Sequence, residues 1–217
     1  MDWDGTYVEC TLVEVSKKNG INYGWIPEYN IDCLYIKRKN LLPVIIDEIK
    51  YVFGIRKIGT RYNKRYIFFP PNIQYNTWLE ETRLSDINEK LSYSNIRQCR
   101  NILAFRYLLG LTNINERSIL YRNGVLYDFN DINCHEFGEK ISLSMRVMKD
   151  WFKEIDVNKT IFLMLKNKDI KNKVELILHV RIELTKVIEV IDKKHIDMVS
   201  TVCNRLIDIF DHVTTGY

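Results

Sequence analysis

The spacing of hydrophobic residues changes along the chain, and this change constrains the fold more than any other feature. In the first 70 residues, apolar side chains alternate with period two in short runs separated by turn residues, a pattern typical of antiparallel strands. In the last 80 residues, they recur every three or four positions, as on one face of a helix. We therefore predict an α+β protein with a β-rich N-terminal part and a mainly α-helical C-terminal part.

The N-terminal part contains alternating apolar runs and one helical run. The predicted strands cover residues 6–15, 21–26 and 31–37, and a hairpin covers residues 56–69 with its turn at residues 63 and 64. The residues between the third strand and the hairpin have helical spacing, with Asn40 as a plausible N-cap and Gly54 just after the end. We predict a helix over residues 41–53.

The middle of the chain carries the strongest turn signal. A largely buried helix is predicted from residue 94 to Gly110, and its apolar side includes Arg106. Two short apolar runs then flank Asn123-Gly124, which is the pairing expected of a two-residue β-hairpin. In the rest of the chain, the helical spacing of apolar residues predicts helices over residues 137–154, 159–167, 171–192 and 195–212.

No Gly, Ser or Pro-rich linker separates these parts, so residues 1–217 are predicted to form a single continuous unit. A β-rich lobe with one helix is expected over residues 1–76, and a mainly helical lobe containing a hairpin at 118–130 over residues 77–217.

The charge of the chain is nearly balanced. It has 32 Lys and Arg against 28 Asp and Glu, a net charge of +4. A DNA-binding domain usually concentrates a larger basic excess on one face. Nucleic acid is therefore possible but not favoured as a partner. The hairpin with Arg61, Lys64 and Arg65 beside aromatic residues keeps it as an alternative, although such a hairpin is more often one half-buried face of a sheet.

The five cysteines are odd in number, contain no CxxC pair, and fit neither a disulfide framework nor a zinc site. No metal site is predicted, and a reducing, intracellular compartment is expected. The first ten residues lack an apolar stretch, and no window is long and apolar enough for a membrane span. A single alanine, Ala104, stands against 28 isoleucines, a bias typical of an AT-rich genome.

The central segment carries the chain's only resemblance to a known family. It reads LGLTNINERSIL from residue 109 and NGVLYDFN from residue 123. This stretch resembles the catalytic-loop region of phosphatidylinositol kinases and of actin-fragmin kinase, which have an L-G-[IV]-x-D loop, a short hairpin around a glycine and a second Asp. The resemblance implies a kinase-like, two-lobed architecture. Reduced relatives of this kind occur in large DNA viruses, so it also suggests a viral protein in host cytoplasm or the virion.

The positions that would carry phosphoryl transfer depart from the kinase pattern. Such enzymes need one carboxylate at the attacking hydroxyl and another to hold Mg²⁺, but this chain has Asn113 and Asn130 there, and Ser118 where a metal-binding Asn is usual. An amide is neutral and cannot accept the proton. Asp128 and Asp131 flank the second position and are the alternative carboxylates.

The sequence motifs that bind the nucleotide in kinases are also missing or poorly matched. The chain has no GxGxxG or Walker A stretch. Lys37 ends the third predicted strand, where the resemblance implies a kinase lysine, and Glu48 on the next helix is its candidate partner. A surface lysine and a solvated glutamate are the simpler explanation of both residues.

The sequence therefore favours a non-catalytic, pseudokinase-like protein that binds no cofactor and acts as an interaction or structural protein, with a protein partner. The first alternative is an active phosphotransferase that uses ATP and Mg²⁺ with Lys37 and either Asp128 or Asp131. The second is a nucleic-acid-binding factor. Whether the chain is an enzyme is left open by the sequence.

Overall fold

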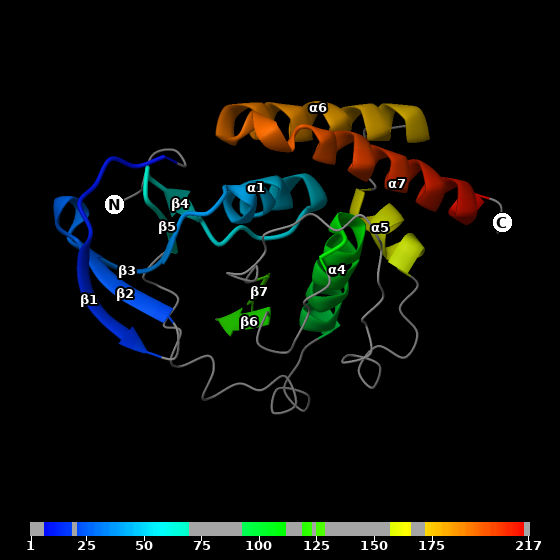
Figure 1. The fold of residues 1–217 in the computed structure, drawn as a ribbon. Coiled ribbons are helices and arrows are strands. Elements are labelled where there is room, and N and C mark those ends of the chain that lie inside the picture. Colours follow the sequence, from blue (N-terminus) through cyan, green and yellow to red (C-terminus); the bar gives the residue numbers. More distant parts are fainter. Residues whose placement is uncertain are drawn as a thin grey trace.

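The computed structural model describes residues 7–18, 21–69, 93–111, 119–122, 125–128, 157–165 and 172–214. Within these ranges, the predicted division is confirmed: strands dominate the N-terminal part and helices the C-terminal part, so the fold is α+β (Figure 1).

A five-stranded antiparallel sheet forms the N-terminal part. Its strands lie in the order β1-β2-β3-β5-β4. They are β1 (Val13–Lys18), β2 (Ile21–Ile26), β3 (Ile31–Lys37), β4 (Arg61–Tyr62) and β5 (Tyr66–Phe69). A 3-10 turn, η1 (Pro27–Tyr29), joins β2 to β3. Between β3 and β4 the chain forms α1 (Leu42–Ile49) and the 3-10 turn η2 (Lys50–Phe53).

The C-terminal part contains a separate two-stranded hairpin and four helices among the described residues. The hairpin pairs β6 (Ile119–Arg122) with β7 (Val125–Asp128). The helices are α4 (Tyr93–Leu109), α5 (Val157–Leu165), α6 (Lys173–Ile191) and α7 (Asp197–Thr214), with the 3-10 turn η5 (Lys193–His195) between the last two. Figure 1 shows α6 and α7 side by side above α1 and α4.

The two faces of the sheet pack against different parts of the chain. Leu34 and Ile67 lie on the face that joins the helices in one large apolar core. Tyr35 and Phe68 lie on the opposite face, in a smaller cluster. Because side chains alternate along a strand, neighbouring residues of β3 and β5 serve these two cores in turn.

The large core is shared by the sheet, the helices and the hairpin. It includes Leu34 of β3, Ile45 of α1, Phe105 of α4, Leu126 of β7 and Phe210 of α7, all buried. One apolar cluster therefore connects the β-rich and helical parts within the described residues.

Two polar contacts tie the C-terminal helices to earlier elements. Arg205 of α7 donates from Nη1 to the carbonyl of Leu108 at 2.7 Å, and the Tyr51 hydroxyl donates to Glu183 Oε2 of α6 at 2.6 Å. The Arg205 contact is buried and satisfies one of the last carbonyls of α4, which has no partner within its own helix.

Most element bounds agree with those predicted, and β2 and β3 agree at both ends. The predicted helix over 41–53 is α1 followed by η2, and it ends at Gly54 with φ 66°. The N-cap of α1 is Leu41, which makes no side-chain cap hydrogen bond, so the predicted N-cap is wrong by one residue. Asn40, one residue earlier, accepts a hydrogen bond from the Leu42 amide at 3.1 Å. The predicted helix over 137–154 lies outside the described residues.

The first predicted strand, over 6–15, is wrong in position, because β1 begins at Val13. Residues 8–12 are extended but lie on the face of the sheet that carries the smaller cluster, where Val8, Cys10 and Leu12 pack. A Cβ on Gly24 of β2 would lie 2.4 Å from Leu12 Cδ1. Only the start of the segment pairs with the sheet, through a parallel bridge between Tyr7 and Tyr62 and a 2.9 Å hydrogen bond from the Val8 amide to the Tyr62 carbonyl. From Val8 to Leu12 the period-two pattern therefore marks a segment that covers a sheet face.

Candidate functional site

The end of the β6–β7 hairpin carries a buried carboxylate, Asp128. Its side chain is fully buried. Arg106 of α4 donates from Nε to Oδ1 at 2.6 Å. Lys50 of η2 donates from Nζ to the Asp128 backbone carbonyl at 2.5 Å, and the same nitrogen lies 3.7 Å from Oδ2. The hairpin is therefore fixed to two helical elements by charged groups.

A second buried carboxylate, Asp47 of α1, completes this cluster. Lys50 Nζ donates to Asp47 Oδ1 at 3.1 Å. The same carboxylate accepts hydrogen bonds from the backbone N–H groups of Ile58, Gly59 and Thr60 at 2.8 to 2.9 Å, and from the Thr60 hydroxyl at 2.8 Å. Asp47 therefore organises the loop that leads into β4. We call Asp47, Lys50, Arg106 and Asp128 the buried charge cluster.

The charges of this cluster cancel, since two carboxylates face one ammonium and one guanidinium. All four side chains are at most 2% exposed. Burial of an isolated charge would be very unfavourable, so each group needs its partner. Burial on its own raises the pKa of Asp47, but the charge of Lys50 and the hydrogen bonds from Thr60 and Ile58 outweigh it and hold that pKa below its usual value.

Within this cluster, Asp128 Oδ2 is buried and accepts no hydrogen bond among the described residues. The nearby Lys50 ammonium is its electrostatic partner. A carboxylate held in this way is screened by two cations, and a Mg²⁺ ion at the same oxygens would be repelled by both.

Sequence reasoning placed Arg106 on the buried side of its helix but assigned it no partner, and it overlooked Lys50 and Asp47 altogether. The sequence did carry a signal for Lys50 and Arg106, since each is a charged residue among apolar ones at helical spacing. Lys50 comes directly after α1, four residues after the buried Ile46, and a charged residue that continues an apolar stripe in this way needs a buried partner. The identity of that partner is set by the fold, because Asp128 lies 78 residues further on.

The other predicted site residues are placed as follows. Asn113, Ser118, Asn130 and Asp131 lie outside the described residues, so their arrangement stays a prediction. Lys37 is exposed at the end of β3. The lysine that contacts Asp128 is Lys50, whereas the alternative phosphotransferase requires Lys37 to act together with Asp128 or Asp131.

Glu48, the candidate partner of Lys37, has two other cationic neighbours. Lys57 Nζ lies 2.8 Å from its Oε2, and Arg61 Nη1 lies 3.9 Å from its Oε1. Both contacts tie α1 to the segment that leads into β4. The described ion pairs of Glu48 are therefore structural ones on the helix surface.

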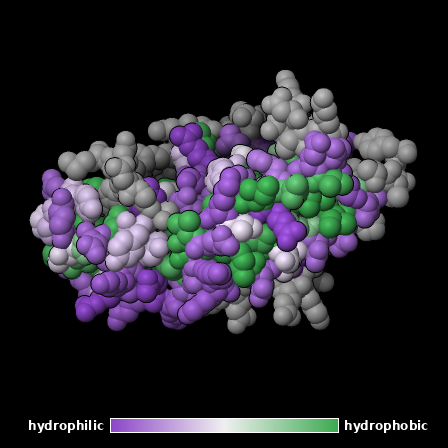
Figure 2. All heavy atoms as spheres, turned by 90° about the horizontal axis from the view of Figure 1, so that it is seen from above, coloured by the Kyte–Doolittle hydropathy of each residue, from purple (hydrophilic) through white to green (hydrophobic). Residues whose placement is uncertain are grey.

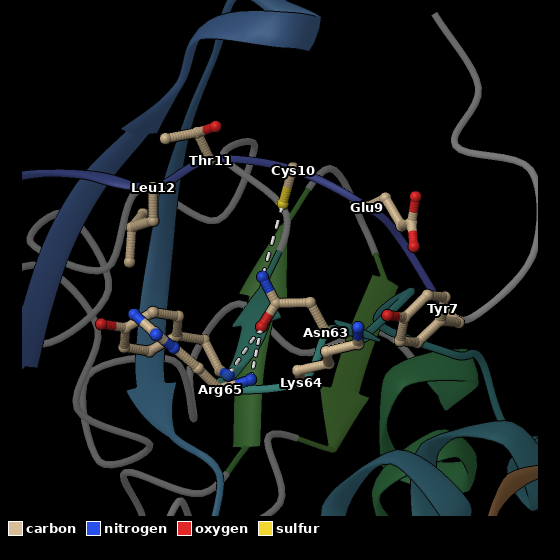
Figure 3. Close-up of a pocket in the computed structure, with 9 residues that line it drawn as sticks. Tyr7, Glu9, Cys10, Thr11, Leu12, Asn63, Lys64 and Arg65 are labelled. Atoms are coloured by element: carbon tan, nitrogen blue, oxygen red, sulfur yellow. Dashed lines mark hydrogen bonds between the residues drawn. The ribbon is translucent and has the colours of Figure 1, made fainter.

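A pocket of about 390 Å³ lies between the extended segment 7–12 and the β4–β5 turn. Figure 3 shows Tyr7, Glu9 and Cys10 on one side of it and Asn63, Lys64 and Arg65 on the other. The Asn63 carboxamide shapes the turn, because its Oδ1 accepts from the Arg65 and Tyr66 amides at 2.8 Å. The pocket combines aromatic, amide and charged groups, with two cations against one acid.

The aromatic residues of the β4–β5 hairpin do not form an open stacking surface. Tyr62, Phe68 and Phe69 are buried in the two cores, and Tyr66 is half-buried. Arg61 is directed to Glu48. The simpler interpretation, a half-buried sheet face, is therefore the better description of this hairpin.

Comparisons with known proteins identify no family for this chain. No protein-family model, no curated protein and no solved structure matches it. Among the described residues, no cluster of three or more His, Cys, Asp or Glu side chains is arranged to hold a metal ion. None of the described helices is long and apolar enough to cross a membrane.

Proposed function

We propose that this protein is non-catalytic and acts by binding other molecules, as a kinase-like interaction or structural protein. The observation that carries the proposal is the state of Asp128. Asp128, one of the two carboxylates that flank the second catalytic position, is buried, paired with Arg106 at 2.6 Å and faced by Lys50 at 3.7 Å. A carboxylate used in this way stabilises the fold and is a poor ligand for Mg²⁺.

An exposed apolar row on α6 supports a protein partner. Val174, Leu178 and Ile182 are 72%, 52% and 46% exposed, and their spacing of four places them on one side of the helix. The opposite side of α6 is buried in the large core. Figure 2, which views the molecule from the side of α6 and α7, shows hydrophobic side chains at the surface of this helical part. A helix that is apolar on both sides is typical of one covered on both.

A phosphotransfer assay tests the proposal. The full chain is incubated with radiolabelled ATP, Mg²⁺ or Mn²⁺, and protein and phosphoinositide acceptors. We expect no transfer above that of Asp128→Asn and Asp131→Asn variants. Asp208→Asn serves as the matched control, because Asp208 is an exposed acid on α7. Metal-dependent transfer by the parent chain that persists in the control and vanishes in Asp131→Asn, or in Asp128→Asn assayed below its lowered Tm, would establish the active alternative.

A further inference from the structure

Two short basic stretches that are distant in the sequence lie at one end of the sheet. Lys37, Arg38 and Lys39 leave β3, and Lys64 and Arg65 form the β4–β5 turn; all five are exposed. The Arg38 amide donates to the Arg65 carbonyl at 2.8 Å, and Arg38 Nη1 donates to the Asn63 carbonyl at 3.1 Å. We call these five residues the basic rim.

The basic rim opens onto the pocket beneath segment 7–12. Lys64 and Arg65 line that pocket directly. Lys37 pairs in register with Tyr66, and directly opposed residues in an antiparallel pair share a face. Lys37 is therefore on the same sheet face as Tyr66, which also lines the pocket. Positive charge thus borders a cavity that contains aromatic rings.

The pocket itself suits a flat heterocyclic base. Its volume of about 390 Å³ lies at the lower end of the range for small-ligand sites. Tyr7 is 40% exposed and packs edge-on against Tyr62 at a centroid distance of 5.4 Å, so Tyr62 holds the Tyr7 ring in place. Asn63 and Thr11 add polar groups to the lining. One acid, Glu9, opposes the basic residues there (Figure 3).

We infer that the basic rim and this pocket form a binding site for single-stranded nucleic acid. The rim contacts the phosphates and the pocket takes a base against Tyr7, the combination of charge and stacking that single-strand-binding proteins use. The basic rim would also attract an anionic membrane surface, but lipid headgroups would leave the polar pocket with its aromatic rings unfilled. The inference rests on the proposed binding role, for which it names a partner class.

Fluorescence anisotropy with a labelled 12-nucleotide oligo(dT), measured from 50 to 300 mM salt, tests this site. Each phosphate contact with a single strand lowers the logarithmic salt slope by about 0.7. The Lys64→Gln/Arg65→Gln variant removes two contacts, so we expect the slope to become less negative by about 1.4 and the affinity to fall roughly 25-fold at 0.1 M salt. Tyr7→Leu should weaken binding about fivefold or more, and Tyr7→Phe should retain it, because the ring is kept.

The matched control is Arg181→Gln/Lys186→Gln on α6, which removes the same charge from two exposed residues away from the pocket. Binding by this control should stay close to that of the parent protein. An equal loss in the rim and control variants would show general charge attraction and overturn the site. Absence of oligonucleotide binding at 50 mM salt, with binding to phosphatidylserine vesicles, would overturn it in favour of a membrane.

This test is independent of the phosphotransfer assay. Failure of the oligonucleotide to bind would remove the nucleic-acid partner and leave the non-catalytic role intact. Metal-dependent phosphotransfer would refute the non-catalytic role and leave the effect of the rim variant unchanged.

Discussion

Replacement of Asp128 by Asn should destabilise the protein strongly. Asparagine keeps the shape of the side chain but removes the charge that balances Arg106 and Lys50, both at most 2% exposed. Removal of one partner from a buried ion pair typically costs about 3–5 kcal/mol of unfolding free energy. For a chain of this size, each kcal/mol lowers Tm by about 2–4 °C, so Tm should fall by about 6–20 °C.

Urea unfolding followed by circular dichroism, together with calorimetry, measures this change. The matched control is Asp211→Asn, since Asp211 is 61% exposed in its ion pair with Lys173, and a surface pair is worth at most about 1 kcal/mol. In a double-mutant cycle, Arg106→Met and Asp128→Asn should be coupled by at least about 1 kcal/mol. A loss for Asp128→Asn no larger than that of the control, or strict additivity with Arg106→Met, would refute the role assigned to the cluster.

Three further predictions concern acid stability, cysteine reactivity and the surface of α6. Burial raises the pKa of Asp47, but the charge of Lys50 and the hydrogen bonds outweigh burial and hold this pKa below its unfolded value. The contribution of Asp47 to the unfolding free energy is therefore present above about pH 4 and is lost as pH falls through the folded pKa. Urea unfolding at a series of pH values should show a shallower decline in acid for Asp47→Asn than for the parent protein. Burial raises the pKa of the Cys33 and Cys99 thiols to about 12, so iodoacetamide at pH 8 should label them only after denaturation, as peptide mass spectrometry would show. Because Leu178 is exposed, Leu178→Lys should change the unfolding free energy by no more than about 0.5 kcal/mol. A larger loss would show that this side of α6 is buried within the chain.

The fold was largely predictable because its elements are specified locally. Turn residues, β-branched runs and helical stripes set β2, β3 and the hairpin ending at Asp128 without reference to distant residues. The error at residues 6–15 has a physical basis, since Val8 and Leu12 face a sheet just as strand residues would. Period two reports which side of an extended segment is buried and not what its backbone pairs with.

The candidate sites were less predictable because they depend on contacts between distant parts of the chain. Lys50 meets Asp128 across 78 residues, and Arg38 meets Arg65 across the sheet. The sequence shows Lys37 to Lys39 and Lys64 to Arg65 as separate short basic stretches in a chain of net charge +4. Only the β3–β5 pairing makes them one surface.

The most direct test of the non-catalytic role is a thermal-shift titration of the full chain with ATP up to 5 mM, with and without 10 mM Mg²⁺. We predict no Mg²⁺-dependent increase in Tm; a small Mg²⁺-independent shift that disappears in Lys64→Gln/Arg65→Gln would reflect the basic rim. A kinase site saturated at 100 times its Kd would add about 2.7 kcal/mol, equal to about 5–11 °C at 2–4 °C per kcal/mol. A Mg²⁺-dependent rise of that size would contradict the proposed function.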